Sequence, residues 1–244
     1  MWSGPRNIST AMMRAFENRA DCAVMDEPFY AAFLAASGLD HPMRDAVIAA
    51  GETDPAKVAD AVCGASASTT EPAAAAVVYQ KHMTHHMLPA FDRGWMADSG
   101  ITHAFLIRAP ERVVASYARK RAAVTLDDLG VTQQAALFDE VAALRGRPAP
   151  VIDADDVLAD PEGLLRALCS ACGIAFDPCM LAWPPGRRTS DGVWAAHWYG
   201  AVEASTGFTR TPPAPLPMLE GAHAEIAAGA RPLYEQLAAY RLRA

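Results

Sequence analysis

Short apolar runs alternate with helical stretches along the chain. Four of these runs are apolar almost throughout: Cys22–Asp26, Ala74–Lys81, His103–Arg108 and Pro150–Asp153. Such runs are typical of strands that are covered on both faces. Met1–Ser3 is predicted to be the stub of a further strand. Strands that alternate with helices favour a parallel sheet, with ligands at the carboxyl ends of its strands.

The intervening segments have helical periodicity. From Phe29 to about Ser66 the pattern is helical and rich in alanine, with breaks at Gly38, Pro42 and Gly51–Pro55. The other predicted helices are Ala11–Arg19 with Ser9 or Thr10 as N-cap, Pro110 to about Ala123, Thr132–Leu144, Pro161–Cys172, and Met218–Arg243 with a second half that begins at Pro232.

These elements predict an α/β fold of three layers, in which a central, mostly parallel sheet of about four to five strands is flanked by helices. No internal repeat or composition shift marks a boundary, so we expect residues 1–244 to form a single domain. Residues 183–217 are rich in Pro, Gly, Arg and Trp and have little periodicity. A long irregular segment of this kind is more often a binding loop than a connector. The C-terminal helices, residues 218–243, follow it.

The composition excludes several classes of function. The 244 residues carry a formal net charge of −7, and 52% of them are hydrophobic. This indicates a folded protein that binds neither nucleic acid nor an anionic membrane, because such binders carry a basic excess. No apolar run is long enough to span a membrane. The residues after Met1 lack the apolar core of an export signal, and we interpret the five cysteines as reduced thiols. We therefore expect a cytoplasmic protein.

Arginine dominates the basic residues, with 18 arginines and three lysines, and guanidinium groups suit phosphate-like anions. The segment SGPRNIST, residues 3–10, leads from the strand stub into a helix. Free amides at the helix start, together with Arg6, would form a cradle for an anion. The Walker A pattern of ATP and GTP sites is absent. The alternative is a capped helix with a solvated Arg6.

A second segment, FLIRAPERVVASY, places Arg108 at the end of a predicted strand and Ser116 about two turns into the next helix. The two side chains would then share a ligand. The alternative is that Arg108 pairs with Glu111 and that Ser116 lies on the helix surface.

Together these segments resemble the sulfotransferase superfamily that uses 3′-phosphoadenosine 5′-phosphosulfate, which has a P-loop-NTPase-like architecture. The loop that holds the phosphosulfate in that family matches Gly4, Pro5, Arg6, Asn7, Ser9 and Thr10, with Ile8 where glycine is usual. The family motif for the 3′-phosphate matches Arg108, Pro110, Val113, Ser116 and Tyr117. Asp153–Pro178 is similar to the strand, acidic turn and helix that follow in the family.

The resemblance implies that this nucleotide is the co-substrate, that no metal is required, and that Arg6 stabilises the leaving phosphate. Two positions compete for the general base that activates the acceptor. Glu27, at the end of a strand, matches a catalytic glutamate of some family members. His82 lies in QKHMTHHM, which resembles the segment that carries a catalytic histidine in others. We favour Glu27, with His82 second and Lys81 as a clamp on the sulfonate.

The irregular segment supplies a third candidate element. Arg187, Arg188, Gly192 and Trp194 resemble the loop with which the family covers the nucleotide, with arginine on the 3′-phosphate and an aromatic ring near adenine. Equally, Trp194 and its aromatic neighbours would pack the loop or line the acceptor pocket.

The leading hypothesis is a sulfotransferase that acts on a hydroxyl or amine of a small-molecule acceptor. The alternatives are a kinase-like phosphotransferase with Asp26 or Asp153 near Mg²⁺, a non-catalytic nucleotide-binding protein of the same fold, and a pyridoxal-phosphate enzyme that uses one of the lysines. The acceptor and the oligomeric state do not follow from the sequence.

Overall fold

The computed structural model describes residues 1–64, 76–119, 124–212 and 214–244. These residues divide into two compact units. Unit 1 comprises Met1, Ser9–Thr102 and Asp177–Phe208, and unit 2 comprises Trp2–Ile8, His103–Phe176 and Thr209–Ala244. In the described part of the chain, no helix is both long and apolar enough to cross a membrane.

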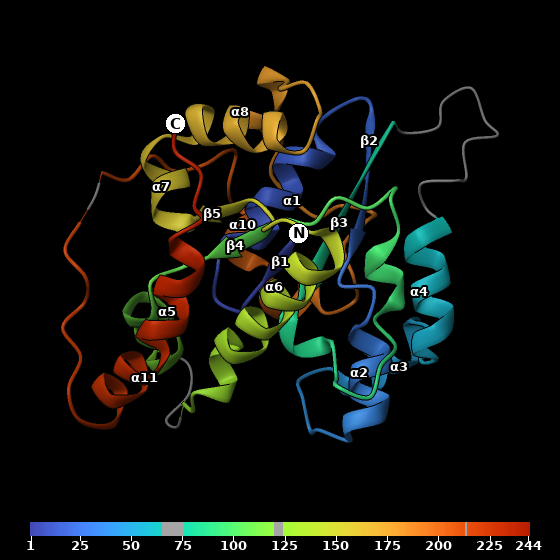
Figure 1. Ribbon diagram of the computed structural model, residues 1–244, viewed down its shortest axis with the longest axis horizontal. Coiled ribbons are helices and arrows are strands. Elements are labelled where there is room, and N and C mark those ends of the chain that lie inside the picture. Colours follow the sequence, from blue (N-terminus) through green and yellow to red (C-terminus); the bar gives the residue numbers. More distant parts are fainter. Residues whose placement is uncertain (65–75, 120–123, 213) are drawn as a thin grey trace. The chain divides into compact units, whose positions relative to one another are not determined.

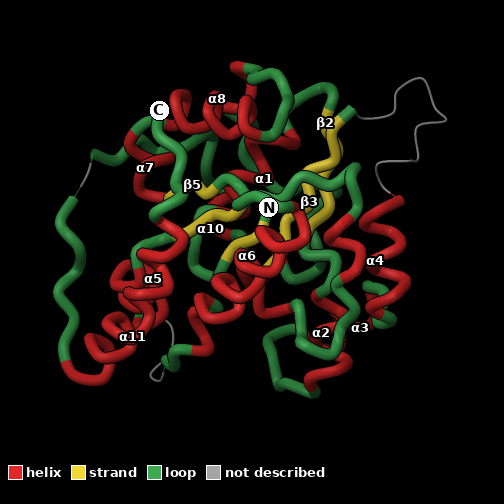
Figure 2. Tube along the Cα trace, viewed as in Figure 1, coloured by secondary structure: helices red, strands yellow, loops and turns green. Residues whose placement is uncertain are grey.

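Three parallel strands form the centre of unit 2. β1 (Trp2–Ser3) pairs with β4 (Phe105–Ile107), which pairs in turn with β5 (Val151–Asp153). Strands are drawn in yellow and helices in red in Figure 2, where β5 is labelled. All the residues of these three strands are buried, as expected for strands that are covered on both faces. The Trp2 indole N–H donates to Nδ1 of His103 at 3.0 Å, so β1 is held by its side chain as well as by its backbone.

Helices pack around these strands in unit 2. Helix α11 contacts both α5 and α6 (Figure 1), and a buried cluster that includes Val113, Val114, Ala227 and Ala230 joins α11 to α5. The helices of the unit are α5 (Pro110–Ala118), α6 (Val131–Arg145), α7 (Ala154–Ala159), α8 (Pro161–Ala171) and α11 (Gly221–Ala238), with the 3₁₀ helix η3 (Asp127–Leu129).

Unit 1 is built on the parallel pair of β2 (Cys22–Asp26) and β3 (Val77–Met83), whose register places Asp26 opposite Lys81. Its helices are α1 (Ser9–Glu17), α2 (Tyr30–Ser37), α3 (Arg44–Ala50), α4 (Pro55–Gly64), α9 (Ala195–Trp198) and α10 (Gly200–Glu203), with the 3₁₀ helices η1 (Thr84–His86), η2 (Gly94–Ala97) and η4 (Pro178–Leu181).

The predicted α/β class is confirmed, and so is the strand count, because the described residues contain five strands in parallel pairs. The predicted breaks in the alanine-rich region are also confirmed. Helix α2 ends at Gly38, whose φ of 66° suits glycine, and α4 begins at Pro55. Residues 74–75 of one predicted strand and 120–123 of one predicted helix lie outside the described residues.

Several details differ from the predictions. β2 is only half-buried, with Ala23 exposed, so this strand is not covered on both faces. Helix α1 begins at Ser9, which makes the predicted N-cap wrong: Ser9 and Thr10 both lie in its first turn. The segment 183–217 is not wholly irregular, because it contains α9 and α10.

The predicted break at Pro232 is also wrong. Helix α11 continues through this residue to Ala238, although proline costs a helix one backbone hydrogen bond. Burial explains the continuity. Ala230 and Leu237, one on each side of the proline, are both fully buried, so the two halves pack within unit 2 as one helix.

We expect Leu165→Ala, in α8, to lower the free energy of unfolding by about 2–5 kcal/mol, because the substitution leaves a cavity where the leucine is now fully buried. The matched control is Leu144→Ala in α6, where the leucine is 45% exposed. Urea unfolding followed by circular dichroism measures both values. Equal losses of unfolding free energy for the two variants would contradict the burial of the Leu165 side chain.

Candidate functional site

The loop that follows β1 is held against β4 in unit 2. The side-chain amide of Asn7 donates to the carbonyl oxygen of Leu106 at 3.1 Å, and its Oδ1 accepts from the amide of Ile8 at 2.9 Å. Gln134, from α6, donates to the same Leu106 oxygen at 2.9 Å. Asn7, predicted to bind the nucleotide, therefore also shapes its own loop.

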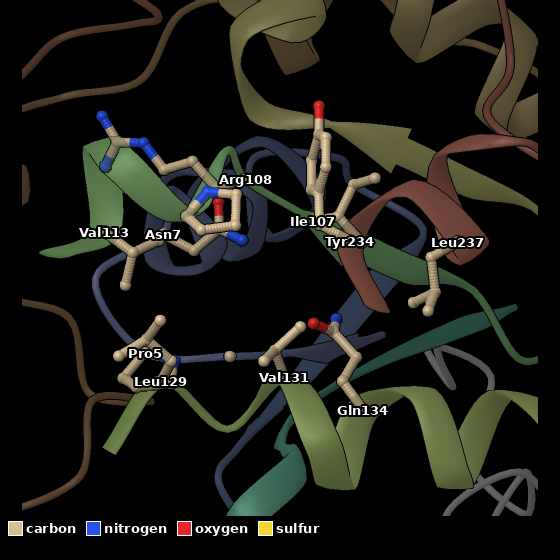
Figure 3. A pocket seen from close by; sticks show the side chains of 12 residues that line it. Pro5, Asn7, Ile107, Arg108, Val113, Leu129, Val131, Gln134, Tyr234 and Leu237 are labelled. Carbon is tan, nitrogen blue, oxygen red and sulfur yellow. The ribbon is translucent and has the colours of Figure 1, made fainter. Parts of the chain in front are cut away.

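Gly4 and Pro5 line a pocket in unit 2 (Figure 3). Asn7, Arg108 and Tyr234 stand on one side of this pocket, opposite Val131 and Gln134. A Cβ on Gly4 would lie 2.7 Å from the carbonyl oxygen of Leu129, so glycine alone fits there. The loop thus approaches the backbone of η3 closely. The full lining is Gly4, Pro5, Asn7, Ile107, Arg108, Pro110, Val113, Leu129, Val131, Gln134, Tyr234 and Leu237.

The two predicted anion-binding arginines lie together in unit 2. Nη1 of Arg108 donates to the backbone carbonyl oxygen of Arg6 at 2.7 Å, and Nε of Arg6 donates to Oγ of Ser116 at 3.1 Å. The residues predicted for the leaving phosphate and for the 3′-phosphate are therefore in direct contact. Arg6 has a φ of 56°, a left-handed conformation that is costly for a residue with a side chain and recurs at functional sites.

The guanidinium group of Arg108 retains an unused donor. Its Nε is buried and has no hydrogen-bond partner among the described residues. Burial lowers the pKa of Arg108, and Arg112 acts in the same direction. An anion would satisfy this buried donor. The alternative predictions are wrong, because Glu111 pairs with Arg231 instead and Ser116 is buried rather than on the surface.

A second cluster of charges surrounds Lys81 in unit 1. Nζ of Lys81 donates to Oδ1 of Asp26 at 2.9 Å, to the hydroxyl oxygen of Tyr199 at 2.7 Å, and to Oε1 of Glu27. Burial alone would lower the pKa of Lys81, but Asp26 and Glu27 outweigh it and raise that pKa well above its usual range. The lysine is therefore charged. It has three N–H groups and three acceptors, so binding a sulfonate would require it to release one.

Glu27, the favoured base, follows β2 directly. Its backbone φ is 45°, again left-handed, and its amide donates to the carbonyl oxygen of Lys81 at 2.9 Å. Burial raises the pKa of Glu27, and the charge of Asp26 adds to this shift, whereas Lys81 opposes it. A raised pKa suits a general base, because such a carboxylate binds a proton more tightly.

His82, the second candidate base, lies in a different environment. Its Nε2 is 3.2 Å from Oε1 of Gln80, and its ring lies near those of Phe29 and Trp95. Neighbouring residues of a strand point to opposite faces, so the side chains of His82 and Lys81 lie on opposite faces of β3. A catalytic role for His82 stays a prediction.

Sequence reasoning did not assign His86 to the site. It is buried in η1, where its ring stacks on those of Tyr30 and Phe33, with centroid separations of 4.4 and 4.9 Å. Its Nδ1 lies 3.9 Å from Oε2 of Glu27. Burial lowers the pKa of His86 well below its usual range, so the imidazole is neutral. The histidine-rich segment QKHMTHHM was a signal in the sequence, but it did not indicate which of its histidines lies beside Glu27.

The predicted nucleotide-covering residues lie in unit 1. Arg187 is 55% exposed, with its Nε 3.9 Å from Glu203. Arg188 donates to the carbonyl oxygen of Pro184 at 3.1 Å. The indole of Trp194 is 9% exposed and packs edge-on against Tyr30, as in the alternative interpretation that this ring packs the loop. Contact of these residues with a nucleotide stays a prediction.

Among the described residues, no group of three or more histidine, cysteine or acidic side chains has the arrangement of a metal site. The two aspartates proposed for a kinase-like reaction already have protein partners. Asp26 accepts from Lys81 and Tyr199. Asp153 accepts from the amide of Asp155 at 2.8 Å and from the Tyr234 hydroxyl at 2.6 Å.

We expect Lys81→Met to lower the free energy of unfolding by about 3–5 kcal/mol at neutral pH, because two buried carboxylates lose their counter-ion. The folded-state pKa of Glu27 is raised above its ordinary value of 4.5, so ionising this group costs folding free energy as the pH rises above that value. Removing Lys81 enlarges the cost. The loss should therefore shrink as the pH falls toward 4.5.

Urea unfolding at several pH values measures this dependence. The matched control is Lys57→Met, because Lys57 is 68% exposed and lies 3.9 Å from its partner Glu52; we expect a change of less than about 1 kcal/mol. A loss for Lys81→Met that did not depend on pH would contradict the proposed charge balance.

Comparisons with known proteins give the chain a family. A family model described as "Sulfotransferase domain" matches residues 1–241. Two proteins of Arabidopsis thaliana, called branched-chain-amino-acid aminotransferase-like proteins 1 and 2, are 36% and 34% identical to the chain over 209 residues, which is 85% of the chain. These residues are only 36% and 35% of the two proteins, so the chain spans about a third of the length of these curated relatives.

A solved structure shares the fold. The sulfotransferase domain from the curacin biosynthetic pathway aligns with a TM-score of 0.51 and 16% sequence identity, covering 94% of this chain and 95% of that domain. At this identity the likeness supports the fold alone. The family model matches almost the whole chain, and the chain therefore belongs to the sulfotransferase domain family.

Proposed function

We propose that this chain transfers a sulfonate group from 3′-phosphoadenosine 5′-phosphosulfate to a hydroxyl or amine group of a small-molecule acceptor. The family supplies the type of reaction. The choice of the sulfonate donor rests on one observation. Arg6, Arg108 and Ser116 lie together in unit 2, and Nε of Arg108 is buried without a hydrogen-bond partner in the described part of the chain. Paired guanidinium groups with a free buried donor suit a phosphate-bearing ligand.

The arginines would act through charge and position. Arg108 and Ser116 bind the 3′-phosphate of the donor in this proposal, and Arg6 stabilises the charge that develops on the leaving 5′-phosphate. Arginine remains protonated at neutral pH and donates no proton. The contribution of these residues to catalysis is therefore electrostatic, as in phosphoryl transfer.

Glu27 would act as the general base. In the reaction, a bond forms between the acceptor oxygen or nitrogen and sulfur, and the bond from sulfur to the 5′-phosphate oxygen breaks. The ionised carboxylate of Glu27 accepts the acceptor proton, and adenosine 3′,5′-bisphosphate leaves with the electron pair of the broken bond. His86, a neutral imidazole beside Glu27, adds no positive charge that would weaken this base.

We expect the wild-type chain to bind adenosine 3′,5′-bisphosphate without Mg²⁺ and Arg108→Ala to weaken this binding by about 10- to 100-fold, because a charge-assisted contact is lost. Binding of adenosine 5′-phosphate should change much less, since it lacks the 3′-phosphate. Calorimetric titration measures both ligands on both variants.

The matched control is Arg166→Ala, because Arg166 is 56% exposed and pairs with Glu162 on the surface of α8; its affinities should equal those of the wild type. Equal losses for the two nucleotides in Arg108→Ala would refute the assignment of Arg108. A wild-type preference for ATP with Mg²⁺ would instead favour the kinase-like alternative.

We expect Glu27→Gln to lower the rate of sulfonate transfer by about 10²- to 10⁴-fold, because glutamine cannot accept the acceptor proton. Binding of adenosine 3′,5′-bisphosphate should be unchanged. The measurement uses radiolabelled donor and a panel of small hydroxyl and amine acceptors.

Glu162→Gln is the matched control, since Glu162 is 50% exposed in α8. A rate that fell in His82→Ala but not in Glu27→Gln would transfer the role of base to His82. Tight nucleotide binding without transfer to any acceptor would support the non-catalytic alternative.

A further inference from the structure

The hydroxyl group of Tyr199 completes the charge cluster of unit 1. It accepts from Nζ of Lys81 at 2.7 Å and from the indole N–H of Trp194 at 3.2 Å, and it donates to the carboxylate of Asp26 at 2.8 Å. A phenol has one proton to donate and two lone pairs, so these contacts use it fully. Burial raises the pKa of Tyr199, and the hydroxyl therefore keeps its proton.

Tyr199 reaches this cluster from a distant part of the sequence. It lies between α9 and α10, 118 residues from Lys81. The same segment adds a backbone contact, since the amide of Gly192 donates to Oδ2 of Asp26 at 3.2 Å. A Cβ on Gly192 would lie 2.2 Å from the ring of Trp194, so this glycine lets the indole pack closely. The segment 192–199 therefore docks on Asp26 through Gly192 and Tyr199.

We propose that Tyr199 is a positioning residue for Glu27: its hydroxyl holds the Lys81 ammonium and the Asp26 carboxylate in place, so that the ammonium remains against Glu27. This inference rests on the proposed function, in which Glu27 is the base. Without the hydroxyl, Lys81 loses one of its three acceptors and Asp26 loses one of its donors. The arrangement that balances Asp26 and Glu27 around one cation is then disturbed.

The groups that face Glu27 give the direction of the effect. They are Asp26 from β2, Tyr30 from α2, Lys81 from β3, His86 from η1 and Tyr199. Burial and Asp26 raise the pKa of Glu27, whereas Lys81 lowers it. Removing the Tyr199 hydroxyl loosens the hold on the Lys81 ammonium and therefore raises the pKa of Glu27, whereas removing the charge of Asp26 lowers it. A structural role alone would not produce shifts of opposite sign.

The test compares Tyr199→Phe with Asp26→Asn. We expect Tyr199→Phe to shift the acid limb of the pH–rate profile for sulfonate transfer upward by about one pH unit, which corresponds to the loss of one hydrogen bond in a charged network. Asp26→Asn should shift the limb downward. Binding of adenosine 3′,5′-bisphosphate should be unchanged in Tyr199→Phe.

Tyr79→Phe is the matched control, because Tyr79 lies in β3 and stacks on Phe16 at 4.4 Å; its profile should equal that of the wild type. Thermal unfolding of each variant shows whether it is folded. An acid limb that does not move in Tyr199→Phe, or that moves the same way in both variants, would overturn the inference.

A second readout separates this inference from the proposed function. The carboxyl carbon of Glu27, labelled with ¹³C and assigned with Glu27→Gln, reports its protonation by NMR whether or not the chain transfers sulfonate. Opposite shifts of this titration in a chain without transfer would support the positioning role and refute the proposed function. If the chain transfers sulfonate but the titration of Glu27 is the same in both variants as in the wild type, the proposed function stands and the positioning role of Tyr199 is refuted.

Discussion

A buried lysine between two carboxylates is the interaction on which the arrangement of unit 1 depends. Lys81 is 1% exposed, and moving an ammonium group out of water costs several kcal/mol unless acceptors replace the water. Asp26, Glu27 and Tyr199 are those acceptors. Two carboxylates face one ammonium, so the cluster has a negative charge in excess when all three groups are ionised. Burial raises the pKa of Glu27, and the charge of Asp26 adds to this shift. The contacts that stabilise the lysine therefore also fix the surroundings of the Glu27 carboxylate.

The backbone at the ends of the strands contributes to both clusters. Among the described residues, a positive φ at a residue other than glycine occurs at Arg6, Glu27 and Met43. Two of these are residues that the sequence predicts to be catalytic. Each is also held by a backbone contact. Arg108, just after β4, donates to the carbonyl oxygen of Arg6, and the amide of Glu27 donates to the carbonyl oxygen of Lys81 in β3. Strained backbone of this kind persists only where surrounding contacts hold it.

The two clusters differ in how their hydrogen-bond donors are satisfied. Around Lys81, each ammonium proton has a protein acceptor. Around Arg108, one guanidinium N–H donates to a backbone carbonyl, and Nε remains buried without an acceptor among the described residues. A buried donor that the protein leaves without an acceptor is suited to an anionic ligand, whereas a fully satisfied ammonium is suited to holding its carboxylate neighbours in place. This contrast underlies the separate roles proposed for Arg108 and Glu27.

Local patterns in the sequence determined much of this protein. Apolar runs and helix breakers predicted the α/β class and the breaks at Gly38 and Pro55, since these depend on residues close together in the chain. Spacing within one motif predicted that Arg108 and Ser116 share a ligand, whereas placing Arg6 in the same site rested on the resemblance to a known family. The tertiary structure decided the rest. The register of β2 and β3 placed Asp26 opposite Lys81, and the docking of a late segment brought Tyr199 to both. Periodicity carries no information about contacts between residues more than a hundred positions apart, because packing and the pairing of buried charges select them.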